Sequence, residues 1–436
     1  MANLFAIKAN ILHFPNATTN PETEYQYFEN GVMVVESDKI KALGHEQDIL
    51  PHFHGIEVID ASGKLLVPGF IDTHLHFPQT EMIASYGEQL LEWLENYTFP
   101  TERKFENVEY SRFIASKFMN QLWSNGTTTA LAYSTVHACS AEALFEKADT
   151  HNMLMITGKT CMDRHCPDWL QDTAETAENE TRALIDKWHN KGRLKYAITP
   201  RFAPTSTTEQ LQRLGRIVQD HSDVFIQTHL SENKDEIEWV KSLYPECIDY
   251  LHVYEQFGLV NERTVFGHCI HLEDHTWERL GELQSIIAFC PRSNLFLGSG
   301  LFEIAKAEQY KVPVTLASDV GAGDSFSMLR TQGEAYKVCQ LQHIKLHPFK
   351  GLYMMTQGSA HALSLDDSIG NLNVGSHADF TLLDPKFNEL SDLRMSSRTN
   401  TPDDTLFALS MLSDERTIAG TWIAGKPVYQ GTNSGV

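Results

Sequence analysis

The chain has 436 residues, of which 35 are basic and 57 acidic, so its formal net charge is −22. A chain this acidic repels polyanions, which argues against nucleic acids and anionic membranes as partners but leaves a small neutral ligand possible. Its longest apolar runs fall short of the ~20 residues of a membrane-spanning helix. Seven scattered cysteines indicate reduced thiols in a cytoplasmic protein.

Both ends of the chain show short apolar runs bounded by turn-forming residues. Near the N-terminus these are residues 31–37 and 55–59, and near the C-terminus 379–384 and 417–429. Such runs are typical of β-strands. We therefore expect a small composite β-sandwich domain formed by residues 1–66 plus 375–436.

The middle of the chain alternates short β-rich runs with amphipathic helical stretches. The predicted strands are 64–71, 127–133, 153–158, 194–199, 224–228, 264–267, 285–290 and 312–318, and the predicted helices include 109–125, 176–191, 208–220, 232–242 and 275–284. Eight such repeats predict an α/β fold, a (β/α)8 TIM-type barrel over residues 67–374. A doubly wound open sheet is the alternative. The long loops 77–106 and 160–175 are expected to cover the barrel mouth.

Polar and titratable residues follow several of these predicted strands. His74 and His76 follow the first strand, His229 the fifth, His268 the sixth and Asp319 the eighth. The active sites of such barrels lie at the C-terminal ends of the strands, so these side chains are expected to meet.

The pair His74 and His76 suits a metal site, because alternate residues of an extended segment face the same way. Taken singly, His229 reads as a hydrogen-bonded core histidine and Asp319 as a helix cap. Together with the pair they predict one divalent ion held by three imidazoles and a carboxylate. That ligand set suits zinc, with iron or cobalt as alternatives.

The motif at residues 68–76, with His229, His268 and Asp319, resembles the amidohydrolase superfamily in its metal-dependent deaminase branch. Segments 76–79, 91–100, 158–164, 200–202, 228–233 and 319–323 resemble, more specifically, the guanine deaminase family. The resemblance covers nearly the whole chain. It implies hydrolytic deamination of guanine to xanthine and ammonia, a purine base as ligand, and a homodimer. His165 departs from the pattern, which favours Asn there.

The resemblance also implies a role for each matching residue. One zinc ion would be held by His74, His76, His229 and Asp319. Catalytic roles fall to Glu232, which protonates a ring nitrogen, to His268, which holds the attacking oxygen, and to Asp319, which takes a proton from the attacking water. The substrate-binding set is His76, Gln79, Arg201, Phe202, His229, Glu232 and Asp319.

Four further residues are given a structural interpretation. Lys159 ends a predicted strand and is interpreted as structural, and Cys290 as part of the barrel wall. Trp93 and Leu94 are expected to pack in a loop or to form a lid.

Two rival functions remain open. One is the same chemistry on a pterin, an adenosine-like nucleoside or a triazine, and the other is a barrel scaffold without activity. Gln79 and Arg201 distinguish between rings, since a hydrogen-bonding site rejects rings that lack matching groups.

Overall fold

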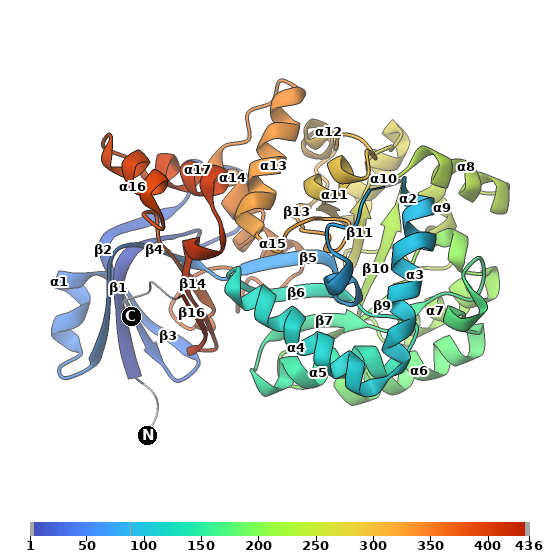
Figure 1. Ribbon diagram of the computed structural model, residues 1–436, viewed down its shortest axis with the longest axis horizontal. Helices are drawn as coiled ribbons and strands as arrows, with labels where there is room; N and C mark the ends of the chain where they lie inside the picture. Colours follow the sequence, from blue (N-terminus) through green and yellow to red (C-terminus); the bar gives the residue numbers. More distant parts are fainter. Residues whose placement is uncertain (1–3, 88, 432–436) are drawn as a thin grey trace.

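A seven-stranded sheet unites the two ends of the chain in the computed structural model, which describes residues 4–87 and 89–431 (Figure 1). Its order is β16-β15-β14-β4-β1-β2-β3. The strands are β1 (Leu4–His13), β2 (Gln26–Glu36), β3 (Lys39–His45), β4 (Glu57–Pro68), β14 (Phe380–Leu383), β15 (Ile418–Ile423) and β16 (Lys426–Gln430). The expected β domain from both termini is confirmed. Its division at 1–66 plus 375–436 stays a prediction, and residues 1–3 and 432–436 lie outside the described residues.

The second sheet curves into a nearly closed parallel barrel, which confirms the predicted fold class. Its strands are β5 (Phe70–His76), β6 (Thr127–Tyr133), β7 (Leu154–Gly158), β9 (Leu194–Pro200), β10 (Phe225–Leu230), β11 (Thr264–His268), β12 (Ile286–Phe289) and β13 (Val314–Leu316), and β8 (Thr160–Cys161) pairs with β9. The chain after β13 closes the barrel against β5. The Asp319 amide donates to the His74 carbonyl oxygen at 2.9 Å, and the Ser318 amide donates to Asp72 at 3.1 Å.

One predicted strand boundary is wrong. Residues 64–71 were expected to form a single strand, but β4 ends at Pro68 in the terminal sheet and β5 begins at Phe70 in the barrel. The apolar run is continuous because both strands are buried, so no polar residue marks the change of sheet. Gly69 lies between them, where a Cβ atom would come within 2.1 Å of Thr128 Oγ1. The chain passes from one sheet to the other at this glycine.

Helices that follow the barrel strands cover the outside of the barrel (Figure 1). They are α4 (Val108–Ser124), α5 (Ala138–Thr150), α6 (Ala174–Trp188), α7 (Thr208–Asp220), α8 (Lys234–Leu243), α9 (Tyr250–Glu255), α10 (Asp274–Leu283), α11 (Pro291–Phe296), α12 (Ile304–Gln309), α13 (Met328–Leu341), α14 (Pro348–Tyr353) and α15 (Gln357–Ala362). Helix α7 shows why they form: Thr207 caps its first turn, and Leu211, Leu214 and Val218 recur on one buried face.

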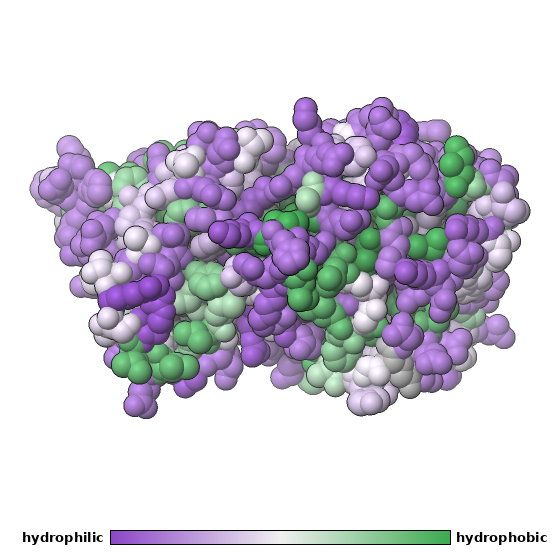
Figure 2. Space-filling view, turned by 90° about the horizontal axis from the view of Figure 1, so that it is seen from above, coloured by the Kyte–Doolittle hydropathy of each residue, from purple (hydrophilic) through white to green (hydrophobic). Residues whose placement is uncertain are grey.

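Short helices occupy the remaining segments. The long loop after β5 contains α2 (Leu90–Trp93) and α3 (Phe99–Glu102), α1 (Glu46–Ile49) follows β3, and α16 (Glu389–Ser396) and α17 (Pro402–Leu412) lie near the C-terminus. Helix α17 contacts α13 and α14 and so joins the terminal region to the barrel. The face in Figure 2 is predominantly hydrophilic. Within residues 4–87 and 89–431, no helix is both long and apolar enough to cross a membrane.

Candidate active site

Four side chains predicted as metal ligands converge at the C-terminal end of the barrel. Asp319 Oδ1 lies 3.5 Å from Nε2 of both His74 and His76. His76 Nε2 lies 3.3 Å from His229 Nε2. Four ligands ~2.1 Å from one ion in tetrahedral geometry lie ~3.4 Å from each other. The spacing of the donor atoms therefore matches one tetrahedral ion.

An unpaired atom at this place also fits a metal. Nε2 of His74, which lies 3.5 Å from Asp319, is buried with no hydrogen-bond partner among the described residues. An ion bound to this nitrogen would satisfy it. Burial lowers the pKa of His74, His76 and His229, which keeps these rings neutral, the form that binds metals. His229 donates from Nδ1 to the Arg201 carbonyl oxygen at 2.6 Å, which leaves its Nε2 for an ion.

Unusual backbone features surround the side chains of this site. Gly267 in β11 lies against His74, and a Cβ atom there would come within 2.5 Å of His74 Cε1. His268 and Asp319 have φ angles of 71° and 49°, in the left-handed region that non-glycine residues seldom adopt. Strain of this kind gathers at functional sites, where neighbouring structure holds it in place.

Two acidic side chains of the site have opposite pKa shifts. Burial raises the pKa of Glu232 to about 7, against an opposing effect of His268. Burial also acts to raise the pKa of Asp319, but its interactions with His74 and His268 outweigh this and hold the pKa at about 2. Close to neutral pH the site thus pairs one ionised carboxylate with one carboxyl that retains a proton part of the time.

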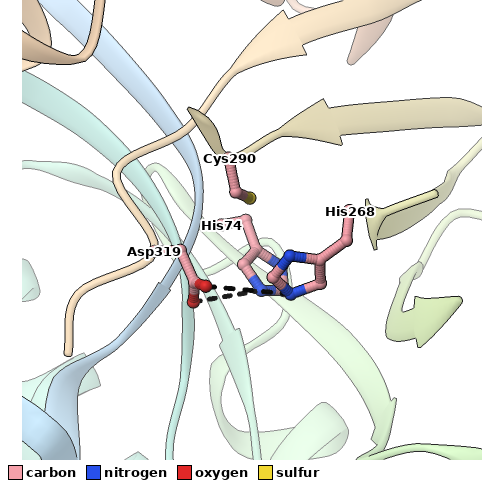
Figure 3. A group of neighbouring side chains, drawn as sticks. All are labelled: His74, His268, Cys290 and Asp319. Carbon is pink, nitrogen blue, oxygen red and sulfur yellow. Dashed lines mark ion pairs between the residues drawn. The ribbon is translucent and has the colours of Figure 1, made fainter. Parts of the chain in front are cut away.

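His268 lies between these two acids. Its Nε2 is 3.4 Å from Glu232 and 3.7 Å from Asp319. Its Nδ1 is 2.9 Å from the side-chain oxygen of Asn294, which is buried and fixes the orientation of the ring. Figure 3 shows His74, His268 and Asp319 pointing toward one another beside Cys290. Burial raises the pKa of the Cys290 thiol, so it stays protonated, a form that binds metals poorly.

A cavity of about 430 Å3, including its mouth, opens beside these groups. It is lined by the predicted substrate-binding residues Gln79, Arg201 and Phe202 together with His76, Leu90, Trp93, Leu94, His229, Glu232, Glu236, His268, Leu297, Asp319 and Ala322. Trp93 and Leu94 are buried here in an apolar cluster that also contains Phe202. They pack over the cavity, and their opening as a lid stays a prediction.

Comparison with known proteins assigns the family. The amidohydrolase family pattern matches residues 65–428. The chain belongs to the amidohydrolase family. It is 48% identical to guanine deaminase of Escherichia coli over 98% of both chains, and the E. coli guanine deaminase structure superposes with a TM-score of 0.96 at 47% identity, covering 98% of this chain and 99% of that one. The structure of guanine deaminase from C. acetobutylicum with bound guanine in the active site has a TM-score of 0.89 at 29% identity, covering 98% and 100%.

The structure of this amidohydrolase also places residues for which sequence reasoning predicted no function. Glu102, from the loop after β5, is fully buried against Arg201 and Gln79. Tyr133, at the end of β6, stacks on His76 with 4.4 Å between ring centroids. No sequence signal distinguishes Glu102 from an ordinary helix acid. Lys159 pairs with Asp172 and lies 3.4 Å from Glu180, as expected of a structural lysine.

Proposed function

We propose that this amidohydrolase is a guanine deaminase, which converts guanine and water to xanthine and ammonia with one zinc ion per chain. The observation that carries the proposal is the similarity to E. coli guanine deaminase, 48% identical over 98% of each chain. A similarity that spans the whole length includes every segment that forms the cavity. The ligand is accordingly a neutral purine base.

His74, His76, His229 and Asp319 would hold the ion. Three imidazole nitrogens and one carboxylate oxygen form a ligand set that zinc accepts in tetrahedral geometry. When bound, such an ion lowers the pKa of a coordinated water and supplies a nucleophile near neutral pH. Asp319, whose pKa is about 2, is ionised and accepts a proton from the attacking water.

Glu232 supplies the acid. Because its pKa is about 7, the carboxyl carries a proton in part of the molecules at neutral pH and can deliver it to a ring nitrogen of the base. Protonation of the ring makes the amino-bearing carbon more electrophilic. After the oxygen has added, the bond from this carbon to the amino group breaks. Of the two protons that the water loses, one leaves with the amino group as ammonia and the other restores the Glu232 carboxyl. His268 lies within 3.4 Å of Glu232 and 3.7 Å of Asp319, a position from which it can orient the attacking oxygen.

Gln79, Arg201 and Phe202 would bind the purine. All three line the cavity and are nearly fully buried. The guanidinium and the amide supply hydrogen bonds to the ring edge, with Arg201 directed at the carbonyl oxygen. Phe202 offers an apolar face for the ring.

A substrate panel tests the proposal. Purified protein with its metal content measured in the same sample is offered guanine, a pterin, adenosine and an amino-triazine at equal concentrations, and loss of each absorbance is followed. Turnover of guanine in preference to the others, with about one zinc per chain, is expected. Turnover of another ring without turnover of guanine points to the rival chemistry. Absence of both metal and turnover after added zinc points to the scaffold.

We also propose that the chain forms a homodimer. Light scattering, which measures the molar mass in solution, tests this proposal.

A further inference from the structure

Glu102 accepts hydrogen bonds from both Arg201 and Gln79, two of the proposed purine-binding side chains. It ends helix α3, and its side chain is fully buried. Arg201 Nη1 lies 2.9 Å from both carboxylate oxygens, and Gln79 Nε2 donates to one of them at 3.3 Å. Arg201 and Gln79 are 3% and 2% exposed, so Glu102 pairs with them largely away from bulk solvent.

The charge of Glu102 has a consequence for the ligand. A buried guanidinium without a counter-charge is strongly destabilising, and such a site would favour an anion. With Glu102 beside it, the Arg201 end of the cavity carries no net charge. That environment suits a neutral ring.

The hydrogen bonds to Glu102 also determine what the cavity can offer. Arg201 uses Nη1 for Glu102, and its Nε and Nη2 have no acceptor among the residues the structure describes. Gln79 accepts from the Gly321 amide at 3.3 Å and gives one N–H to Glu102, which leaves one N–H. The N–H groups of Arg201 and Gln79 that are left for a ligand are donors, and they match an acceptor such as a ring carbonyl oxygen.

We propose that Glu102 is a positioning residue that determines specificity: it orients Arg201 and Gln79 as donors and so selects rings that carry a carbonyl oxygen at the matching position. This inference rests on the proposed function, because it takes guanine as the ligand. It adds to the proposed function the residue, Glu102, that holds the two donors Arg201 and Gln79 in place.

The variant Glu102→Gln tests this role, because it keeps the size of the side chain and removes the charge. Misplaced donors should lower kcat/KM for guanine ~10²-fold, mainly through KM. Inhibition by 2-aminopurine, which has the same ring without the oxygen, should change by less than about threefold, the size of an ordinary neutral substitution. Both KM and the inhibition constant are independent of how much of the protein is folded, so lost stability does not imitate this result.

Two further variants complete the experiment. Glu81→Gln is the matched control, since Glu81 precedes α3 but pairs with Lys104 and Tyr110 and does not line the cavity; it should leave both constants unchanged. Glu102→Asp keeps the charge on a shorter side chain and should restore part of the guanine activity. If Glu102→Gln does not accumulate as folded protein, Glu102→Asp is measured in its place. A smaller loss of kcat/KM for guanine is then expected, with the inhibition constant of 2-aminopurine unchanged.

The outcomes separate the two proposals. Equal losses for guanine and 2-aminopurine in a Glu102 variant, or unchanged guanine kinetics, overturn the positioning role and leave the proposed function intact. Absence of guanine turnover by the unsubstituted enzyme overturns both.

Discussion

Replacement of Glu232 by glutamine tests the central proton transfer. The side chain is buried, accepts a hydrogen bond from Ser299 at 3.3 Å and lies 3.4 Å from His268. Glutamine keeps the size and can make similar contacts, but it cannot deliver a proton. Loss of a positioned acid costs ~10²–10⁴-fold in kcat, which corresponds to ~3–5 kcal/mol of transition-state stabilisation. The proposed metal ligands are untouched, so zinc content should be unchanged.

The raised pKa of Glu232 also predicts a change in stability. An ordinary glutamate carboxyl has a pKa of 4.5, whereas the pKa of Glu232 in the folded protein is about 7. Between these values the folded protein binds a proton that the unfolded chain has released, so this group makes stability fall as the pH rises through that window. The shift corresponds to ~3 kcal/mol. Metal-free Glu232→Gln should therefore be more stable than the unsubstituted protein by up to ~3 kcal/mol above pH 7, with little difference below pH 4.5.

Guanine absorbance, zinc content and denaturant unfolding at pH 4.5 and 8 measure these effects. Glu238→Gln is the control, since Glu238 lies on helix α8, which begins two residues after Glu232, but is exposed and pairs with Lys241. It should behave like the unsubstituted enzyme. Glu232→Gln with more than about a tenth of the original kcat would remove Glu232 from the proton transfer, because such a loss is smaller than general acid catalysis supplies. An unchanged difference in stability between the two pH values would refute the raised pKa.

Three further predictions concern the metal and its surroundings. Removal of zinc by a chelator should lower the melting temperature, and added zinc should restore it, since an ion at 1,000 times its Kd stabilises by ~4 kcal/mol. Gly267→Ala should lose most bound zinc, measured by elemental analysis, because the added Cβ lies 2.5 Å from His74 Cε1, whereas Gly44→Ala meets only the end of Ile49 and should retain it. Asn294→Ala should keep zinc and lose ~10–100-fold in kcat, because it frees the His268 ring; unchanged kcat would show that the ring needs no such support.

The side chains that were expected to meet at the strand ends, and that the structure brings together, share one physical cause. In a parallel barrel the C-terminal ends of all strands open on the same side, so finding the strand ends also finds the side chains that meet there. His74, His229 and Asp319 lie 155 and 90 residues apart along the chain, yet His74 and Asp319 approach to 3.5 Å. The strands themselves could be found because each is a short apolar run between amphipathic helices.

The residues that could not be predicted lie where this rule does not apply. Glu102 belongs to a loop after β5, next to Arg103 and Lys104, and reads as an acid on a solvated helix. Its partner Arg201 is 99 residues away, and nothing in either segment points to the other. Asn294 is likewise an ordinary polar residue near a helix start. Side chains that act through other side chains depend on packing between loops, which local patterns do not report.

Glu232 and Asp319 can be told apart physically only in the structure, because burial and nearby histidines shift their pKa values in opposite directions. Glu232 and Asp319 are both carboxyls that follow a barrel strand, and as sequence they carry the same charge. In the fold, burial dominates for Glu232 and raises its pKa to about 7, whereas histidine contacts outweigh burial at Asp319 and hold its pKa at about 2. A bound cation would strengthen that contrast further at Asp319, which it would contact directly. The environment of each group therefore supports the proposed assignment of Glu232 as acid and Asp319 as base.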